Sequence, residues 1–291
     1  MTLHYTQLEM LCEQYDGFLI DQFGVLLNGD GPYPGATLAL EYLHDQGKRV
    51  VILSNSGKRS EANCARLVSH GFARHLFETV LSSGEVAWER IRREIGKSIP
   101  RNGSVFVMIK DGDIDPLVGL ELNRTDNAKM ADLLVIVSRD PVRVLSSYKN
   151  ELESLSERNI PCYCLNPDKQ MLVTSGGLIE SAGHIADIYA SLGGVVTWFG
   201  KPYAVVYEEA KKLLKPLNDN QILCIGDSLE HDIKGGGDAS LSTALVRTGV
   251  LSRHNDDAIM RMFEEIHEPD YILDQFTLEF ASSREIGTRL E

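Results

Sequence analysis

The sequence is poor in basic residues, and it lacks any long hydrophobic run. It contains 29 Lys and Arg against 42 Asp and Glu, which gives a formal net charge of −13. This balance argues against a general nucleic-acid or membrane-surface binder, because both functions need clusters of positive charge. No apolar run reaches the ~18 residues of a membrane-spanning helix. Anionic small molecules remain acceptable ligands if a metal ion or local cations offset the negative field.

Cysteine is also scarce and irregularly placed. The chain has five cysteines, and only Cys162 and Cys164 lie close together. Their C-x-C spacing lacks the paired pattern of a zinc site, and an odd number does not suit a disulfide framework. The first residues carry neither the basic nor the apolar stretch of a signal peptide. We therefore expect reduced thiols and a cytoplasmic location.

The chain of 291 residues is long enough for about two domains. Several short runs of branched aliphatic residues end at a polar residue or a glycine. Because these runs are apolar throughout, they predict strands that are covered on both faces, as in a parallel sheet. The runs are Phe18–Ile20, Val50–Leu53, Ile222–Ile225 and Thr243–Val246.

Helical patterns alternate with these runs, at Ala36–Gln46, Ser60–His70 and Pro202–Leu214. This alternation predicts an α/β fold with a Rossmann-like, doubly wound parallel sheet. Ligands bind such sheets at the carboxyl ends of the strands. The residues predicted at those ends are Asp21, Ser54 and Asp227.

The middle of the chain carries an alternation of its own. Strands are predicted at Val105–Ile109, Leu133–Val137 and Cys162–Leu165, and a helix at Leu178–Ala190. We interpret residues 84–194 as a second α/β module. It is inserted into a core that is formed by residues 1–83 and 195–291.

Two of the strand ends carry groups that suit phosphate chemistry. Asp21 is followed by Gly24, which permits a sharp bend, although a lone aspartate at a strand end is more often a turn former. Ser54 and Asn55 offer a hydroxyl and free backbone N–H groups ahead of a helix, which suits either a phosphate cradle or an ordinary helix cap.

Two further segments lie near the other end of the core. Lys201 follows Phe199 and Gly200 and precedes Pro202, although a lysine before a helix is normally solvated. Asp227 and Asp232 lie in a glycine-bounded loop after a buried strand. Two carboxylates in such a loop suit a hard cation with oxygen ligands.

These four segments, in this order, resemble the haloacid dehalogenase superfamily of phosphotransferases, and the resemblance covers nearly the whole chain. It implies that Asp21 is the nucleophile and that Lys201 is the catalytic cation. It also implies that Ser54, Asn55 and Lys201 bind the phosphate. The implied Mg²⁺ ligands are Asp21, Asp227, Asp232 and the backbone carbonyl of Phe23.

The inserted module looks like a class II cap. The segments Ser83–Glu85, Asn166–Asp168 and Phe199–Pro202 are most similar to the branch with nitrophenyl-phosphate, pyridoxal-phosphate and nucleotide phosphatases. Asn166 and Asp168 either reach the substrate from the cap or cap the next turn. Caps of this kind often pair, so a homodimer through the cap is the protein partner that the resemblance suggests.

The resemblance implies a Mg²⁺-dependent phosphatase that acts on a small phosphate ester, such as a sugar phosphate, nucleotide monophosphate or aryl phosphate. Because a phosphate dianion repels a carboxylate, Mg²⁺ and Lys201 must neutralise charge before Asp21 can attack. An aspartyl-phosphate intermediate then divides hydrolysis into two easier displacements.

Phe23 departs from the family pattern, which usually has an acid/base aspartate at this position. Phenylalanine cannot transfer a proton, and such help is typically worth ~10²–10⁴-fold in rate. The enzyme could use substrates with acidic leaving groups, or a cap residue could supply the proton. The alternative is a catalytically impaired protein that binds phosphate or nucleotide. A phosphoacceptor signalling domain is a third class, which the length and the inserted module disfavour.

Overall fold

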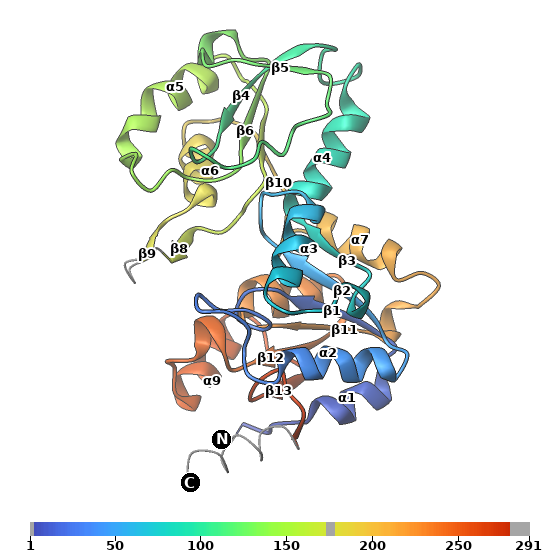
Figure 1. Ribbon diagram of the computed structural model, residues 1–291. Helices are drawn as coiled ribbons and strands as arrows, with labels where there is room; N and C mark the ends of the chain where they lie inside the picture. Colours follow the sequence, from blue (N-terminus) through green and yellow to red (C-terminus); the bar gives the residue numbers. More distant parts are fainter. Residues whose placement is uncertain (1–2, 173–177, 280–291) are drawn as a thin grey trace. The chain divides into compact units, whose positions relative to one another are not determined.

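The computed structural model describes residues 3–172 and 178–279, and the chain forms two compact units (Figure 1). Unit 1 comprises residues 1–54, 61–81 and 201–291, whereas unit 2 comprises residues 55–60 and 82–200. Each unit contains a predominantly parallel sheet with helices, so the predicted α/β class is confirmed.

Unit 1 is built on a six-stranded sheet with the order β13-β12-β11-β1-β2-β3. The pairings from β13 through to β2 are all parallel. The strands are β1 (Gly17–Asp21), β2 (Arg49–Ser54), β3 (Thr79–Ser82), β11 (Ile222–Gly226), β12 (Ser242–Val246) and β13 (Tyr271–Leu273).

The strand order reverses direction at β1, which pairs with β11 on one side and β2 on the other. In open α/β sheets a crevice for ligands forms at such a switch point, beyond the carboxyl ends of the strands. The chain therefore places the ends of β1, β2 and β11 next to one another although they are far apart in sequence.

Helices and buried side chains enclose this sheet. Phe18 and Ile20 of β1 join a hydrophobic core with residues of α1 and α2, while Leu19, which points to the other face, is also fully buried. The sheet is therefore covered on both faces, as the apolar runs predict. The helices are α1 (Leu8–Gln14), α2 (Ala36–Asp45), α3 (Ser60–Ser69), α7 (Ala204–Leu213), α8 (Gly235–Asp238) and α9 (Asp256–Glu265).

Unit 2 contains a five-stranded parallel sheet with the order β10-β7-β6-β4-β5, and a separate antiparallel pair of β8 and β9. The strands are β4 (Gly103–Met108), β5 (Leu122–Arg124), β6 (Leu133–Ile136), β7 (Cys162–Cys164), β8 (Gln170–Leu172), β9 (Leu178–Glu180) and β10 (Val196–Trp198). The helices are α4 (Ser83–Glu94), α5 (Lys149–Glu157) and α6 (Ala182–Ser191).

Two predicted helices begin later than the sequence pattern indicates. The helix predicted from Leu178 is wrong at its start, because residues 178–180 form β9 and α6 begins at Ala182. The helix predicted from Pro202 begins at Ala204, and the Lys201–Pro202 peptide bond is cis. In residues 3–172 and 178–279, no helix has the length and apolar character that a membrane span requires.

Candidate active site

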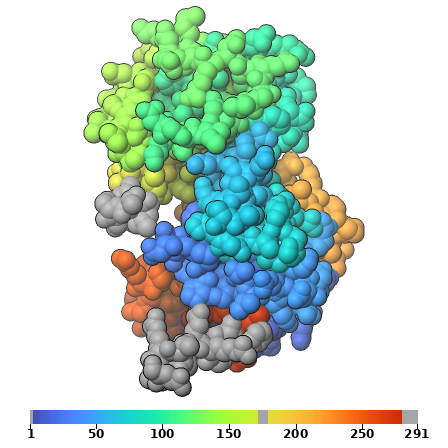
Figure 2. Space-filling model, in the orientation of Figure 1, coloured from blue at the N-terminus to red at the C-terminus, as the bar shows by residue number. Residues whose placement is uncertain are grey.

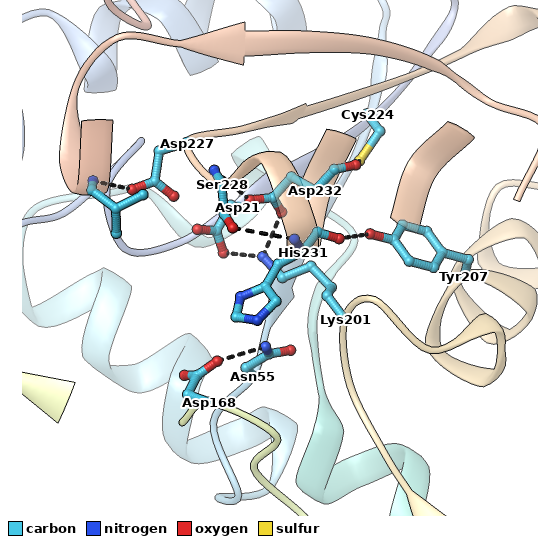
Figure 3. A network of polar contacts seen from close by, with 11 residues as sticks. Asp21, Asn55, Asp168, Lys201, Tyr207, Cys224, Asp227, Ser228, His231 and Asp232 are labelled. Carbon is cyan, nitrogen blue, oxygen red and sulfur yellow. Dashed lines mark hydrogen bonds and ion pairs between the residues drawn. The ribbon is translucent and has the colours of Figure 1, made fainter. Parts of the chain in front are cut away.

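Three carboxylates meet at the switch point of the unit 1 sheet. Asp21 is the last residue of β1, Asp227 directly follows β11, and Asp232 lies in η5, a single-turn π-helix over Leu229–Lys234. One carboxylate oxygen from each residue lies within 4.8 Å of the others, and all three side chains are buried. Figure 3 shows that the three groups turn toward a common centre.

Lys201 joins this cluster from a distant part of the sequence. Its Nζ atom lies 2.5 Å from Asp21 Oδ1 and 2.7 Å from Asp232 Oδ1 (Figure 3). The side chain is buried, with 2% of the residue exposed. The structure therefore brings together four of the residues that the sequence proposes for catalysis and metal binding.

Backbone groups hold two of the carboxylates in place. The Ser228 N–H donates to Asp232 Oδ2 at 3.1 Å, and the Val250 N–H donates to Asp227 Oδ2 at 2.8 Å. Gly24 packs directly on Asp227, because a Cβ atom at Gly24 would lie 2.1 Å from Asp227 Oδ2. Gly24 also has a φ of +91°, which side-chain-bearing residues rarely adopt. Glycine is thus required for the turn to approach the carboxylates.

The electrostatic state of the cluster reflects its burial and its crowded charges. Burial raises the pKa of Asp21 well above its ordinary value, and Asp232 and Asp227 raise it further while Lys201 opposes them. Burial and then Asp232 raise the pKa of Asp227 from its ordinary 3.8 to about 7. Burial alone would lower the pKa of Lys201, but Asp21 and Asp232 raise it above its ordinary value, so the amine stays protonated.

This arrangement fits a divalent cation. The cluster holds three carboxylates against one ammonium, so it carries an excess of negative charge when all groups are ionised. Buried like charges are costly unless a counter-charge offsets them, which is why the pKa values of Asp21 and Asp227 are raised. Oxygen ligands suit Mg²⁺ and Ca²⁺. The donor set and its crowding therefore match a hard metal ion.

Two other unit 1 residues are near the cluster, one on the strand paired with β1 and one next to Asp21 in sequence. Ser54 is the buried last residue of β2, the strand paired with β1. Gln22, directly after Asp21, is fully buried, and within the described residues neither of its amide atoms has a hydrogen-bond partner. Sequence reasoning did not identify Gln22, because nothing in the local pattern distinguishes a buried glutamine from a turn residue.

The remaining predicted binding residues lie in unit 2, where they form a small polar chain. Asn55 Nδ2 donates to Asp168 Oδ1 at 2.8 Å, and the Asp168 N–H donates to Asn166 Oδ1 at 3.0 Å. Gly200 packs on Asn55, since a Cβ atom at Gly200 would lie 2.6 Å from Asn55 Oδ1. The Asn166–Asp168 segment is thus bonded to the residue that follows Ser54, a link that the sequence did not suggest.

Phe23 lies in the turn between Asp21 and Gly24, and 46% of the residue is exposed. Three backbone hydrogen bonds close this turn. The Gly24 N–H donates to the Leu27 carbonyl, and the N–H groups of residues 26 and 27 both donate to the Gln22 carbonyl. The Arg66 guanidinium of α3 lies 5.6 Å from the centre of the Phe23 ring. The Phe23 ring is therefore a half-exposed group near the Arg66 guanidinium, in the turn that follows Asp21.

Comparison with known families and proteins supports the resemblance. A family model for haloacid dehalogenase (HAD)-like hydrolases matches residues 18–123. A second family model, described as HAD-hydrolase-like, matches residues 198–278. The two matched segments contain Asp21, Ser54, Lys201, Asp227 and Asp232.

Similar proteins match across most of their length. The chain is 28% identical to the sugar-phosphatase AraL of Bacillus subtilis over 89% of both chains. It is 26% identical to the 5′-nucleotidase YutF of the same organism, over 90% of this chain and 96% of the relative. The structure of a p-nitrophenyl phosphatase from Archaeoglobus fulgidus is similar with a TM-score of 0.73 and 26% identity, covering 93% of this chain and 99% of the other.

Proposed function

We propose that this chain, which belongs to the haloacid dehalogenase-like hydrolases and is a phosphoric monoester hydrolase, uses Mg²⁺ and an aspartyl-phosphate on Asp21 to hydrolyse small phosphorylated metabolites. The observation that carries the proposal is the convergence of Asp21, Asp227 and Asp232 on one centre, with Lys201 bonded to two of them.

In the proposed mechanism the chain's own residues bind and attack the phosphoryl group. Asp21 supplies the carboxylate oxygen that attacks phosphorus in line with the ester oxygen. Lys201 offsets the negative charge of the nucleophile and of the phosphoryl oxygens. Ser54 and Asn55 donate hydrogen bonds to those oxygens. When bound, Mg²⁺ supplies Lewis-acid charge neutralisation, held by Asp21, Asp227, Asp232 and the Phe23 carbonyl.

We assign turnover rather than mere ligand binding to this site. Two relatives that match over about nine-tenths of the chain are named as a sugar-phosphatase and a 5′-nucleotidase. The four buried charged side chains that the chemistry needs are present: Lys201 is bonded to Asp21 and Asp232, and an oxygen of Asp227 lies within 4.8 Å of oxygens of both. Substrates of the sugar-phosphate, nucleotide-monophosphate and aryl-phosphate classes are the ones that the relatives' names suggest.

Unit 2 is proposed to act as a cap that contributes Asn166 and Asp168 to substrate binding. It is also the proposed contact surface of a homodimer. In the segment between β4 and β6, coloured green and lying on the visible face of unit 2 in Figure 2, Ile114 is 73% and Val118 69% exposed. Exposed apolar side chains of this kind favour association with another protein surface. Sedimentation velocity of the whole chain tests this point.

We also propose that the protein acts in the reducing environment of the cytoplasm. All five cysteines are buried thiols. Burial raises the pKa of the Cys162 thiol well above its ordinary value, so the reactive thiolate form is disfavoured.

A substrate panel tests the proposed function. The purified chain is incubated with a sugar phosphate, a nucleotide monophosphate and nitrophenyl phosphate, and free phosphate is measured with Mg²⁺ and with EDTA. Release that depends on Mg²⁺ is the expected result. Thermal stabilisation by a phosphorylated ligand without any release of phosphate would instead support a binding protein.

A further inference from the structure

The turn that carries Asp232 has an unusual backbone conformation. Residues 229–234 form a π-helix, and the Ile233 N–H donates at 3.1 Å to the Ser228 carbonyl, five residues earlier. π-Helical turns are rare, and they occur frequently at functional sites. The position of one carboxylate of the cluster therefore depends on the groups that hold this turn.

Two buried side chains from other elements bond to the backbone of this turn. The Tyr207 hydroxyl donates to the His231 carbonyl at 2.6 Å, and the Cys224 thiol donates to the Asp232 carbonyl at 3.6 Å (Figure 3). Burial raises the pKa of Tyr207 well above its ordinary value, so the hydroxyl keeps the proton that it donates. The peptide groups on both sides of Asp232 are thus anchored, one to α7 and the other to β11.

Tyr207 also joins two segments that meet in the cluster. It lies in α7, which begins three residues after Lys201, whereas Asp232 lies in the π-helix. Gly235 follows the π-helix and packs closely on α7, since a Cβ atom there would lie 2.6 Å from Tyr207 Oη and 2.9 Å from Pro202 Cα. The segments that supply the 2.7 Å contact between Lys201 Nζ and Asp232 Oδ1 are therefore packed together beside the Tyr207 hydroxyl.

The contacts behind Asp232 matter because of what a small divalent cation requires. Mg²⁺ takes oxygen ligands at about 2.0–2.1 Å in a near-ideal octahedral geometry. A carboxylate that shifts away from this geometry binds the ion less tightly. Groups that orient a metal ligand without touching the metal are therefore important, and their loss typically costs ~10–100-fold in metal affinity or activity.

We propose that Tyr207 is a positioning residue of the metal centre, because its hydroxyl fixes the π-helix and so holds the Asp232 carboxylate beside Asp21 and Asp227. This inference rests on the proposed function, since it takes the carboxylate cluster as a cation site. Without the hydroxyl, the His231 carbonyl loses a buried donor and the turn can shift. The carboxylate then meets the cation in a poorer geometry.

A second buried tyrosine provides a matched control. Tyr189 of α6 is also fully buried, and its hydroxyl donates to the Ile160 carbonyl at 2.5 Å. Tyr189→Phe therefore breaks the same kind of bond in segments that carry no proposed metal ligand. The pair Tyr207→Phe and Tyr189→Phe separates an effect on the metal centre from the general cost of losing a buried hydrogen bond.

The experiment measures the Kd of Mn²⁺ by electron paramagnetic resonance, and the Mg²⁺ dependence of nitrophenyl-phosphate hydrolysis. Tyr207→Phe should raise the Kd, and the Mg²⁺ concentration that gives half-maximal activity, by ~10–100-fold. Saturating Mg²⁺ should restore most of kcat, because the bound cation then holds Asp232 itself. Tyr189→Phe should lower the Tm in EDTA, as Tyr207→Phe does, but leave both metal constants unchanged.

Cys224→Ala is a second test, which keeps the tyrosine and removes the donor to the next carbonyl of the same turn. It should also raise the Kd of Mn²⁺, but by less, since a thiol is a weak donor. If Tyr207→Phe does not fold, the Cys224→Ala result decides alone: a raised Kd supports the inference, and an unchanged Kd overturns it.

An unchanged Kd in Tyr207→Phe, with a Tm lowered as in Tyr189→Phe, would overturn the inference and leave the phosphatase intact. A fall in kcat that saturating Mg²⁺ does not restore would also overturn it, as would a wild type that binds no Mn²⁺. Failure of the wild type to hydrolyse any phosphate ester would instead refute the proposed function, and the Kd of Mn²⁺ would still test the role of Tyr207.

Discussion

The two units contain parallel sheets of similar construction, but they differ in how their buried charged side chains are paired. In unit 1, three carboxylates and Lys201 are buried together at the ends of the strands. In unit 2, the buried Arg139 follows β6 and donates to the Glu180 carbonyl at 3.0 Å and to its carboxylate at 3.3 Å. The two terminal nitrogens of the Arg139 guanidinium thus have acceptors, although its buried Nε atom has none among the described residues, whereas the unit 1 carboxylates repel one another.

This difference indicates where the chemistry lies. Matched polar contacts fix a backbone arrangement, and they need no ligand to complete them. Crowded carboxylates with raised pKa values are costly to the folded chain and are typical of functional sites, where a bound ligand offsets the cost. The same sheet architecture therefore supports a reactive centre in unit 1 and a bonded framework in unit 2.

The largest effect is expected from Asp21→Asn, which removes the nucleophile. Phosphate release from nitrophenyl phosphate should fall by more than ~10³-fold, while circular dichroism shows an unchanged fold. Asp30→Asn, an exposed aspartate in the following loop, is the matched control and should retain activity. Full activity of Asp21→Asn would exclude Asp21 as the nucleophile.

A pair of glycine substitutions sharpens the contrast between the units. In Gly24→Ala the new Cβ atom would lie 2.1 Å from Asp227 Oδ2, so kcat/KM should fall by up to ~10²-fold through displacement of the site. In Gly84→Ala it would lie 2.1 Å from the Gly57 carbonyl oxygen, so the free energy of unfolding should fall by ~1–3 kcal/mol.

The control for both glycine variants is Gly29→Ala, where a Cβ atom would meet nothing within 4 Å. Enzyme kinetics and thermal denaturation are measured on all three variants. If Gly24→Ala and Gly84→Ala lower activity and stability in the same proportion, the proposed separation between reactive centre and framework is wrong.

The pH dependence of stability tests the crowded carboxylates. Asp227 has a folded pKa of about 7 and an ordinary value of 3.8, so between these pH values the folded chain holds more protons than the unfolded chain. The free energy of unfolding should therefore fall as the pH rises through this window. In EDTA, thermal denaturation should show a lower Tm at pH 8 than at pH 5.

Asp227→Asn should flatten this dependence, because a neutral amide has no charge to bury. Mg²⁺ should also reduce the loss of stability in the wild type, since a bound cation favours the ionised carboxylates. At each pH the free energy of unfolding of the variant is subtracted from that of the wild type, which removes the contribution of the other titrating groups. An identical pH profile for the two chains would contradict the raised pKa of Asp227.

The smallest effect on catalysis is expected in unit 2. Arg139→Met removes the hydrogen bonds to the Glu180 carbonyl and carboxylate, which should lower the free energy of unfolding by ~1–3 kcal/mol. The kcat/KM for nitrophenyl phosphate should stay nearly unchanged. A large fall in kcat/KM without a fall in Tm would mean that Arg139 acts on the substrate instead.

The sequence predicted the central elements of the fold because their signals are strong. The apolar runs at Phe18–Ile20 and Ile222–Ile225 became β1 and β11, and the glycines after them mark where the chain turns. By contrast, β5 over Leu122–Arg124 was missed, because it is a short edge strand whose residues are largely exposed. Such a strand has no hydrophobic period to detect.

The predicted site was limited in a similar way. The three aspartates Asp21, Asp227 and Asp232 could be predicted from their positions at or after the ends of predicted strands, because parallel strands place their carboxyl ends together. Spacing cannot show that the Val250 N–H bonds Asp227, or that Asn55 bonds Asp168, because these contacts join segments whose approach depends on tertiary packing. The sequence therefore identified the charged residues but not the groups that orient them.

The division of the chain into two units has a consequence for how such proteins diversify. The chain passes from unit 1 to unit 2 after Ser54 and after Leu81, and it returns to unit 1 after Ser60 and after Gly200. Replacement of unit 2 by an unrelated module would keep the three acidic side chains of unit 1. It would, however, change the residues that directly follow Ser54 and directly precede Lys201. Such a replacement would keep the carboxylate cluster, but the binding of the phosphate would have to be adjusted at the two junctions that adjoin Ser54 and Lys201.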